Sequence, residues 1–302
     1  MRTKLSDIER SRIRIALIED AGKGDPTTEA IVPEEALGRG AFLVKQPGVL
    51  AGLDIARQVF EIFEEQTGAK SPIFEYREFA EDGTSVKAGD VVAEVRGRLR
   101  TLLTAERVAL NLLQRMSGIA TLTHRFVEAI HGTGATILDT RKTAPLLRPF
   151  DRYAVRAGGG TNHRYGLSDM ILVKDNHIAA AGGSIPLVLE RLAQHFAIPE
   201  VVRVPVEVEV TSLAQFSELL IHGKGIVQRV LFDNFDNVML REGVKMNGGT
   251  FEMEASGGVT LERVRSIAET GVHFISVGAL THSVLGLDIS LEIEPEAIPS
   301  RS

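Results

Sequence analysis

Four short apolar runs follow one another in the second half of the chain: Val206-Glu-Val-Glu-Val210, Arg229-Val-Leu-Phe-Asp233, Phe251-Glu-Met-Glu-Ala-Ser256 and His273-Phe-Ile-Ser-Val-Gly278. These runs recur roughly every 22 residues, and helix-like segments such as 212–220 and 261–270 lie between them. Two similar runs, 136–139 and 170–174, precede the series. Strand and helix therefore alternate, which predicts βα units and a parallel sheet.

The ends of these predicted strands are polar or glycine residues. In a (β/α) barrel the active site collects at the carboxyl ends of the strands, so this pattern favours a TIM-like barrel. An open doubly wound sheet is the structural alternative. It would bind its ligand at one switch point, whereas here the polar ends are spread over at least six predicted strands.

Residues 1 to about 116 have a different pattern. A helix-like segment runs to about residue 20, and a turn-rich segment at 22–27 follows it. Residues 83–97 alternate apolar and polar side chains between glycine turns, which predicts two strands of a small sheet or sandwich. A similar alternation occurs in biotinyl and lipoyl carrier domains, but no modifiable lysine stands alone at a hairpin tip. We therefore interpret this segment as an ordinary glycine-turned sandwich.

The connection between the two regions has apolar residues at helical spacing over 104–131, which predicts one long helix or two consecutive helices. At the other end of the chain, residues 285–293 alternate apolar and polar side chains and predict a final strand. The expected domains are therefore residues 1–116 and a barrel over 117–284. We expect the strand within 285–302 to return to the first domain.

Composition excludes several classes of function. The chain contains no cysteine, so a disulfide framework, a thiolate zinc site and a cysteine nucleophile are impossible, and a reducing, cytoplasmic location is the simpler expectation. No run of about 18 apolar residues is present, and we expect no membrane span. Neither the Walker phosphate loop nor the Rossmann glycine fingerprint occurs in a suitable context. Without a stripe of basic and aromatic residues, nucleic-acid binding has little support.

A cluster of cationic or proton-carrying side chains stands out because the net charge of the whole chain is -6. It lies within Asp139-Thr-Arg-Lys-Thr143, Gly158-Gly-Gly-Thr-Asn-His-Arg164 and Lys174-Asp-Asn-His177. Its members are Arg141, Lys142, His163, Arg164, Lys174 and His177. Arginine clamps a carboxylate bidentately and lysine serves phosphate as a point charge, so the cluster predicts a pocket for a small polyanion.

Carboxylates follow the same strand ends. The period of two in 206–210 places Glu207 and Glu209 on one face, which we expect to line the barrel lumen; a half-exposed edge strand is the alternative. Asp233 ends the next run, and with Glu209 it offers oxygens suited to ribose hydroxyls or Mg2+. A carboxylate that only caps the following helix is the alternative for Asp233. The same alternative applies to Glu252 and Glu254.

Glycine turns follow the last two strands of the series. Ser256-Gly257-Gly258 and Gly278-Ala279 leave room for backbone N–H groups to approach a phosphate, next to the starts of the following helices. Barrels often hold phosphate after their late strands. These turns therefore indicate a phosphate subsite beside the cationic cluster.

Taken in order, the motifs resemble those of the quinolinate phosphoribosyltransferase family, also called nicotinate-nucleotide pyrophosphorylase (carboxylating). The resemblance rests on residues 19–28, 104–111, 139–143, 158–164, 174–177, 206–210, 232–234, 254–258 and 277–282. It covers nearly the whole chain, although residues 184–205 and 242–250 match less clearly. The ordered set is far more specific than any single motif.

The resemblance implies an N-terminal α/β sandwich, a C-terminal incomplete α/β barrel, and a homodimer, or a higher homo-oligomer, with a shared active site. It implies that the two carboxylates of quinolinate are held by Arg141, His163, Arg164 and Lys174, with Arg107 reaching in from the partner. It also implies that phosphoribosyl pyrophosphate is held by Lys142, Glu209, Asp233, Ser256, Gly257, Gly258, Gly278 and His282.

The implied reaction joins the pyridine nitrogen to the ribose, expels pyrophosphate and releases the 2-carboxylate as CO2, giving nicotinate mononucleotide for NAD synthesis. Lys142, Lys174, Glu209 and Asp233 are the expected catalytic residues, and Mg2+ is expected to arrive with the pyrophosphate near Glu209 and Asp233. The alternatives are a nicotinate-preferring transferase, a paralogue outside NAD synthesis, a Schiff-base barrel aldolase using Lys142 or Lys174, and a phosphate-ligand binding protein.

Overall fold

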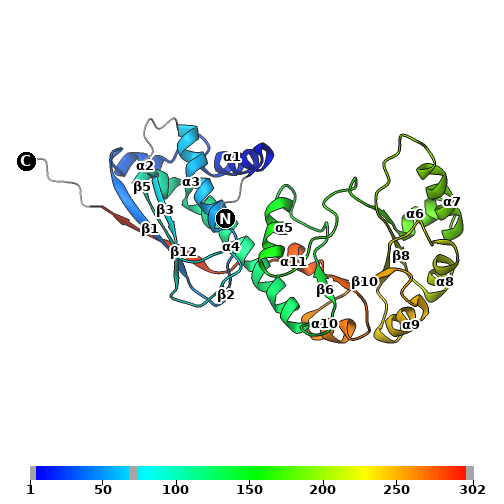
Figure 1. The fold of residues 1–302 in the computed structure, drawn as a ribbon. Helices are drawn as coiled ribbons and strands as arrows, with labels where there is room; N and C mark the ends of the chain where they lie inside the picture. Colours follow the sequence, from blue (N-terminus) through cyan, green and yellow to red (C-terminus); the bar gives the residue numbers. More distant parts are fainter. Residues whose placement is uncertain (1–4, 68–73, 297–302) are drawn as a thin grey trace, which may run out of the picture. The chain divides into compact units, whose positions relative to one another are not determined.

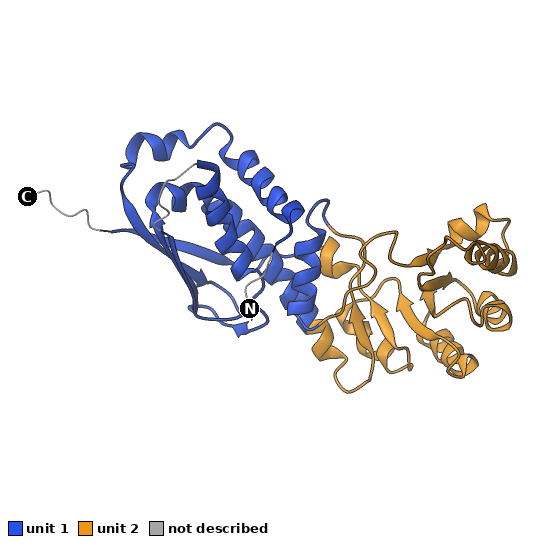
Figure 2. Ribbon diagram, turned by 45° about the horizontal axis from the view of Figure 1, so that its top comes forward, with its two compact units in different colours: residues 1–124, 144–159, 284–302 blue, residues 125–143, 160–283 orange. Residues whose placement is uncertain are grey.

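The computed structural model describes residues 5–67 and 74–296 and divides into two compact units, coloured separately in Figure 2. Unit 1 comprises residues 1–124, 144–159 and 284–302, and unit 2 comprises residues 125–143 and 160–283. These bounds differ from the expected domains, 1–116 and 117–284. The difference arises because the long helix α4 (Leu99–Ala129) continues past residue 116 and α5 (Arg148–Ala157) belongs to unit 1.

Unit 1 is an antiparallel sheet with helices (Figure 1). Its strands are β1 (Leu37–Val44), β2 (Gly48–Val49), β3 (Phe74–Glu78), β4 (Ser85–Val86), β5 (Val91–Arg98) and β12 (Ile289–Pro295). Its other helices are α1 (Asp7–Ala21), α2 (Pro26–Ile31) and α3 (Leu53–Thr67). The main sheet has the order β12-β1-β5-β3, and β2 pairs with β4. Because β12 pairs antiparallel with β1, the last strand returns to the N-terminal sheet, as expected for residues 285–302.

Local sequence accounts for the start of unit 1. Helix α1 begins with a capping box in which Ser6 and Glu9 satisfy each other's backbone N–H groups. Residues 22–25 of the predicted turn-rich segment separate it from α2, in which the backbone N–H groups of Thr27 and Thr28 donate to the side chain of Asp25. Pro26 then opens α2 at a position that needs no backbone donor.

Two predictions for unit 1 identified elements but left open how the strands pair and whether one or two helices form. The segment 83–97 does contain two strands, but β4 pairs with β2 whereas β5 lies in the main sheet between β1 and β3. The apolar pattern over 104–131 belongs to a single helix, α4, which starts at Leu99, directly after β5. Within the described ranges, no helix combines the length and the hydropathy that a membrane span requires.

Unit 2 is built on a six-stranded sheet with the order β6-β11-β10-β9-β8-β7, and neighbouring strands in it pair in parallel. Its strands are β6 (Thr136–Leu138), β7 (Ile171–Val173), β8 (Val206–Val210), β9 (Arg229–Asp233), β10 (Glu252–Ser256) and β11 (Phe274–Ser276). Its helices are α6 (Asp175–Ala180), α7 (Ile185–Phe196), α8 (Leu213–His222), α9 (Asn237–Asn247), α10 (Leu261–Ala268) and α11 (Ala279–His282).

The strand order of unit 2 follows the chain from β7 to β11 and then closes onto β6, without the reversal that defines a doubly wound sheet. Helices α7, α8, α9 and α10 follow one another along the outside of this curved sheet (Figure 1). Strands β6 and β7 are its two edges and do not pair with each other. This is the winding of an incomplete (β/α) barrel, and the predicted fold class is confirmed.

Candidate active site

A cavity of about 450 Å3 opens at the carboxyl ends of the parallel strands of unit 2. It is lined by Thr140, Arg141, Lys142, His163, Arg164, Leu172, Lys174, Glu209, Leu231, Asp233, Asn234, Glu254, Ser256, Gly257, Gly258 and Ser276. Most side chains predicted for the two substrates are therefore brought together, from loops and strand ends that are far apart in the sequence. A cavity at this end of the strands is where barrels carry their active sites.

Two guanidinium groups on the cavity wall influence each other. Burial lowers the pKa of Arg164, and the nearby charge of Arg141 lowers it further. The Nη1 of Arg164 donates to the carbonyl oxygen of Met170 at 2.8 Å, which holds the side chain in place. Two like charges held together are relieved by an anion between them, so this wall of the cavity suits a carboxylate or phosphate.

The loop that carries His163 and Arg164 is fastened to a buried carboxylate. Asp139, which directly follows β6, accepts the backbone N–H of His163 and the Nδ2 of Asn162, each at 2.6 Å. Asp139 is fully buried, so these bonds are made in a low dielectric and orient the loop strongly. The loop therefore presents His163 and Arg164 to the cavity in a defined arrangement.

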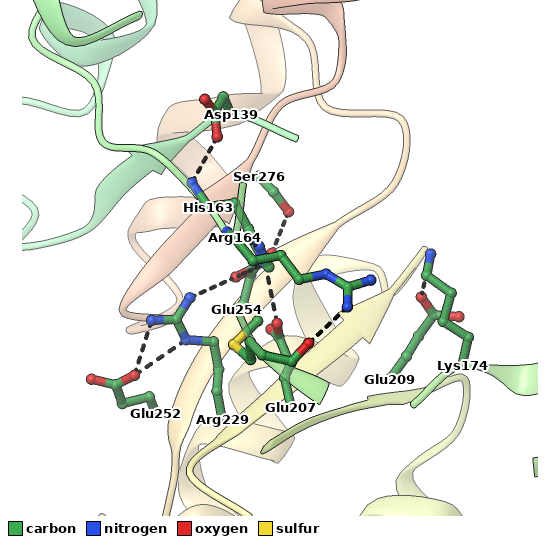
Figure 3. Close-up of polar contacts among 11 residues, drawn as sticks. Asp139, His163, Arg164, Lys174, Glu207, Glu209, Arg229, Glu252, Glu254 and Ser276 are labelled. Carbon is green, nitrogen blue, oxygen red and sulfur yellow. Dashed lines mark hydrogen bonds and ion pairs between the residues drawn. The ribbon is translucent and has the colours of Figure 1, made fainter. Parts of the chain in front are cut away.

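The imidazole of His163 lies among charged groups from three other strands (Figure 3). Its Nε2 lies 3.1 Å from Oε2 of Glu207 and 3.5 Å from Oε2 of Glu254. Burial alone would lower the pKa of His163, but the two carboxylates outweigh burial and raise the pKa to about 9. On the other side of the ring, Nδ1 accepts the backbone N–H of Arg164 at 2.7 Å, which favours the neutral ring. Two charged partners outweigh one neutral donor, so the net direction is upward.

The two carboxylates below His163 are both fully buried. Burial raises the pKa of Glu207, to about 7, against the influence of His163. Burial also acts to raise the pKa of Glu254, but His163, Ser276 and Arg229 together lower it. The Oγ of Ser276 donates to Oε1 of Glu254 at 2.5 Å, and Nη1 of Arg229 lies 3.2 Å from Oε2. Ligand atoms of His163, Glu207 and Glu254 also lie within 4.8 Å of one another, but here Arg229 supplies the compensating cation that a metal ion would otherwise provide.

The predicted carboxylates at the cavity itself are Glu209 and Asp233. Strand β8 lies between β7 and β9, so the alternative that Glu207 and Glu209 sit on a half-exposed edge strand is wrong. Asp233 ends β9 and accepts from Nδ2 of its neighbour Asn234 at 2.8 Å. The cap of α9 is Asp236, which accepts from Val238 and Met239, so Asp233 does not cap that helix.

The turn after β10 lies close to the backbone of the loop after β9. Gly257 has a φ of +93°, and a Cβ at this position would lie 2.1 Å from Oδ1 and 2.9 Å from the backbone nitrogen of Asn234. Asn234 itself has a φ of +57°, and its N–H donates to the carbonyl oxygen of Ser256. Only glycine fits at residue 257, and the two loops after β9 and β10 are held together at the cavity.

Three predicted residues lie outside the cavity lining. Gly278 and His282 stand behind Lys142: a Cβ on Gly278 would lie 3.2 Å from Cδ of Lys142 and 3.2 Å from Nε2 of His282. The Oγ1 of Thr281 donates to the carbonyl oxygen of Lys142 at 2.8 Å, which ties this turn to the loop after β6. Arg107 belongs to α4 in unit 1, where its side chain is 58% exposed.

His177, a member of the predicted cationic cluster, forms a hydrogen bond at the start of a helix. Its Nδ1 accepts the backbone N–H of Lys174 at 3.0 Å, at the start of α6. It lines a second cavity of unit 2, which shares Arg164 with the cavity of the strand ends, but it does not line the latter cavity. His177 is therefore not among the side chains that line the cavity of the strand ends, and one nitrogen of its ring is used at the start of α6.

Sequence reasoning missed several residues of the cavity. Thr140, Asn234 and Ser276 line it, and Arg229 forms an ion pair with Glu254 beneath His163. Thr140, Asn234 and Ser276 lie at or directly after strand ends, so their positions in the βα series could have identified them. Arg229 carried no such signal, since it is the first residue of its strand.

Family models match both parts of the chain. The model described as quinolinate phosphoribosyl transferase, N-terminal domain, matches residues 25–117, and the model for the C-terminal domain matches residues 119–292. Among curated proteins, nicotinate-nucleotide pyrophosphorylase [carboxylating] from Mycobacterium leprae is 43% identical, with 95% of this chain and 98% of that protein covered. The chloroplastic protein of the same name from Oryza sativa is 42% identical, covering 94% and 77%.

Solved structures agree with these matches. NadC from Streptococcus pyogenes superimposes with a TM-score of 0.87 at 36% identity, covering 98% of this chain and all of that one. Nicotinate-nucleotide pyrophosphorylase from Ehrlichia chaffeensis superimposes with a TM-score of 0.86 at 35% identity, covering 97% of this chain and 100% of that one. The likeness therefore extends over both units of the chain.

Proposed function

The chain belongs to the quinolinate phosphoribosyltransferase family, and we propose that the cavity of unit 2 transfers the phosphoribosyl group of phosphoribosyl pyrophosphate to quinolinate. The products are nicotinate mononucleotide, pyrophosphate and CO2, and the reaction serves NAD synthesis. The enzyme is thus a decarboxylating pentosyltransferase. This function is supported by one observation above all: cations and carboxylates line the same cavity at the strand ends.

At the acid end of the cavity, Arg141, Arg164 and Lys174 hold the two carboxylates of quinolinate, with His163 beside them. The mutual influence of Arg141 and Arg164 supports a doubly charged ligand, because a single carboxylate would leave more of their repulsion uncompensated. Quinolinate has two carboxylates and nicotinate has one. The cation count therefore favours quinolinate over the nicotinate-preferring alternative.

At the ribose end, Glu209 and Asp233 stabilise the positive charge that develops on the sugar as pyrophosphate leaves. Lys142 neutralises the departing phosphates, supported by the backbone of Ser256, Gly257 and Gly258. Gly278 and His282 lie next to Lys142 and are proposed to contact the same phosphates. Fixing both substrates in one cavity converts their encounter into an intramolecular step, and no protein nucleophile is required.

Decarboxylation follows from the charge on the ring. Once its nitrogen is joined to the ribose, the pyridinium accepts the electron pair that the departing CO2 leaves at carbon 2, and a proton then replaces the carboxylate there. A cavity shielded from water favours the loss of this charge-separated carboxylate.

The donor chemistry of the cavity fits Mg2+. This ion takes oxygen ligands and is usually bound by one or two carboxylates together with substrate phosphates, and Glu209 and Asp233 both line the cavity. These two residues would hold it. When bound, the ion would neutralise charge on the pyrophosphate leaving group.

A second subunit is part of the proposal. Arg107 is exposed on α4 and has a weak contact, 3.9 Å, with its neighbour Glu106. An exposed arginine of unit 1 is suited to reach a carboxylate in the cavity of another subunit, as a homodimer with shared active sites requires. Cytoplasmic placement is likewise proposed, on the absence of cysteine from the sequence.

Two further functions make different predictions. A Schiff-base aldolase would use a lysine amine as its nucleophile, whereas Nζ of Lys174 lies 3.5 Å from a Glu209 oxygen and is paired with that carboxylate. Borohydride would trap a carbonyl substrate on such an enzyme and should trap nothing here. A phosphate-ligand binding protein would bind phosphoribosyl pyrophosphate without turnover.

The test is an assay with purified protein, Mg2+, phosphoribosyl pyrophosphate and quinolinate labelled in its 2-carboxylate, with nicotinate in parallel. We expect labelled CO2 and nicotinate mononucleotide, both lost when phosphoribosyl pyrophosphate is omitted and in the Arg141→Ala variant. Product from nicotinate alone would assign the nicotinate-preferring activity. Product from neither acid would refute the transferase function.

A further inference from the structure

Arg229 contacts the site from the opposite end of the sheet. It is the first residue of β9, whereas the cavity opens where the strands end. Its Nη1 lies 3.2 Å from Oε2 of Glu254, and the same oxygen lies 3.5 Å from Nε2 of His163 (Figure 3). One carboxylate oxygen therefore connects Arg229 to the histidine of the cavity.

The side chain of Arg229 is held in a single arrangement. Its Nε and Nη2 donate to Oε2 of Glu252 at 3.2 and 3.0 Å, and its guanidinium lies 3.9 Å from the centroid of the Phe274 ring. Glu252 is half exposed, whereas the Arg229 side chain is 19% exposed. Arg229 thus reaches Glu254 from a fixed position, as a planar guanidinium with several donors can.

The ion pair between Arg229 and Glu254 changes the net charge of the buried groups beneath the cavity. Glu207 and Glu254 are two fully buried carboxylates, and His163 supplies at most one positive charge to them. With Arg229 the four groups can sum to zero. Without it, the buried group would keep an uncompensated negative charge whenever Glu207 is ionised, which its pKa of about 7 allows at neutral and higher pH. That charge would lie directly beneath a cavity that has to bind a dianion, where a low dielectric makes the repulsion strong.

We propose that Arg229 is a positioning residue for the substrate carboxylates: it neutralises Glu254, and Glu254 then holds the imidazole of His163 without repelling the bound acid. This inference rests on the proposed function. Arg229 does not line the cavity, so its effect is transmitted through Glu254 and His163.

The test compares the Arg229→Gln variant with the Arg229→Gln/Glu254→Gln double variant in the quinolinate assay. In the single variant, KM for quinolinate should rise about tenfold, which is about 1.4 kcal/mol, while kcat stays within about twofold. The double variant removes one charge of each sign, and Ser276 can still donate to the amide oxygen. It should therefore recover most of the lost affinity for quinolinate.

Conservative and remote variants separate positioning from a loss of packing. Arg229→Lys keeps the charge and should stay near the wild-type KM, and Arg265→Gln, which breaks an exposed pair with Glu269, should change nothing. An unchanged KM in Arg229→Gln, or a double variant as poor as the sum of both single ones, would overturn the inference. If Arg229→Gln fails to fold, the double variant decides alone: a wild-type KM supports the charge balance and a raised KM refutes it. An inactive wild-type protein would instead refute the proposed function itself.

Discussion

The Nζ of Lys174 lies 3.5 Å from Oε2 of Glu209, so the residue directly after β7 faces a carboxylate of the neighbouring strand β8 at the cavity. Lys174 is 47% exposed on its side chain and Glu209 is 10% exposed. The lysine is thus accessible to a substrate, whereas the carboxylate is recessed. If Lys174 binds the acid and Glu209 stabilises the transition state, as proposed, substitution of the two residues should affect different kinetic constants.

Substitution of this pair should separate KM from kcat. Lys174→Met removes a carboxylate partner and should raise KM for quinolinate about tenfold. Glu209→Gln removes charge stabilisation of the transition state and should lower kcat about a hundredfold with a smaller change in KM. Steady-state kinetics with both substrates varied measure this. Identical effects of the two substitutions on kcat would contradict the division of roles.

Two neighbouring aspartates should have opposite phenotypes. Asp233→Asn should lower kcat about a hundredfold with little loss of stability, because Asp233 lines the cavity and caps no helix. Asp236→Ala removes the cap of α9 and should lower the free energy of unfolding by about 1 kcal/mol while activity stays intact. Denaturant unfolding and kinetics on both variants test this; activity loss in Asp236→Ala alone would reverse the assignment.

Gly257→Ala should damage the loop pair after β9 and β10. The new Cβ would lie 2.1 Å from Oδ1 of Asn234 at a φ of +93°, and relief requires one loop to move. We expect a loss of about 2–4 kcal/mol in unfolding free energy and a higher KM for phosphoribosyl pyrophosphate. Gly249→Ala is the matched control: its φ is +80°, but no atom lies within 4 Å of the added Cβ, so only about 1 kcal/mol is expected. Equal losses would show that backbone strain alone matters.

The stability of the fold should fall at alkaline pH through His163. Its pKa is raised from 6.5 to about 9, so its contribution to stability is fully present below pH 6.5 and is lost as pH rises through 9. The difference in unfolding free energy between wild type and His163→Gln should therefore shrink between pH 7 and pH 10. Urea titrations across this range measure it. Parallel curves for the two proteins would show that the two carboxylates do not raise this pKa.

Removal of divalent ions should stop turnover selectively. If Mg2+ enters with pyrophosphate near Glu209 and Asp233, chelation with EDTA should abolish product formation, and added Mg2+ should restore it. Binding of quinolinate alone, followed by calorimetry, should be unaffected because its partners are cationic side chains. Full activity in excess EDTA would remove Mg2+ from the proposal.

Much of the site could be predicted because the active-site residues of a (β/α) barrel lie at the carboxyl ends of its strands. The recurring apolar runs located β8 and β9 with their observed bounds, and the polar residues at the strand ends were the candidates for the site. Lys142, Lys174, Glu209 and Asp233 were found in this way, and all line the cavity. His177 does not line it, and charge alone does not distinguish a substrate ligand from a ring that accepts a helix N–H.

The alternation of strand and helix, the cationic cluster and the family could be predicted from the sequence, since periodicity and ordered motifs are local properties of a chain. Only the tertiary structure decided that α5 belongs to unit 1 and that β4 and β5 enter different sheets. It also decided that Arg229 supports His163 through Glu254. Such contacts join residues on different strands, and the charge balance of a buried cluster depends on all its members, so no single segment of sequence encodes it.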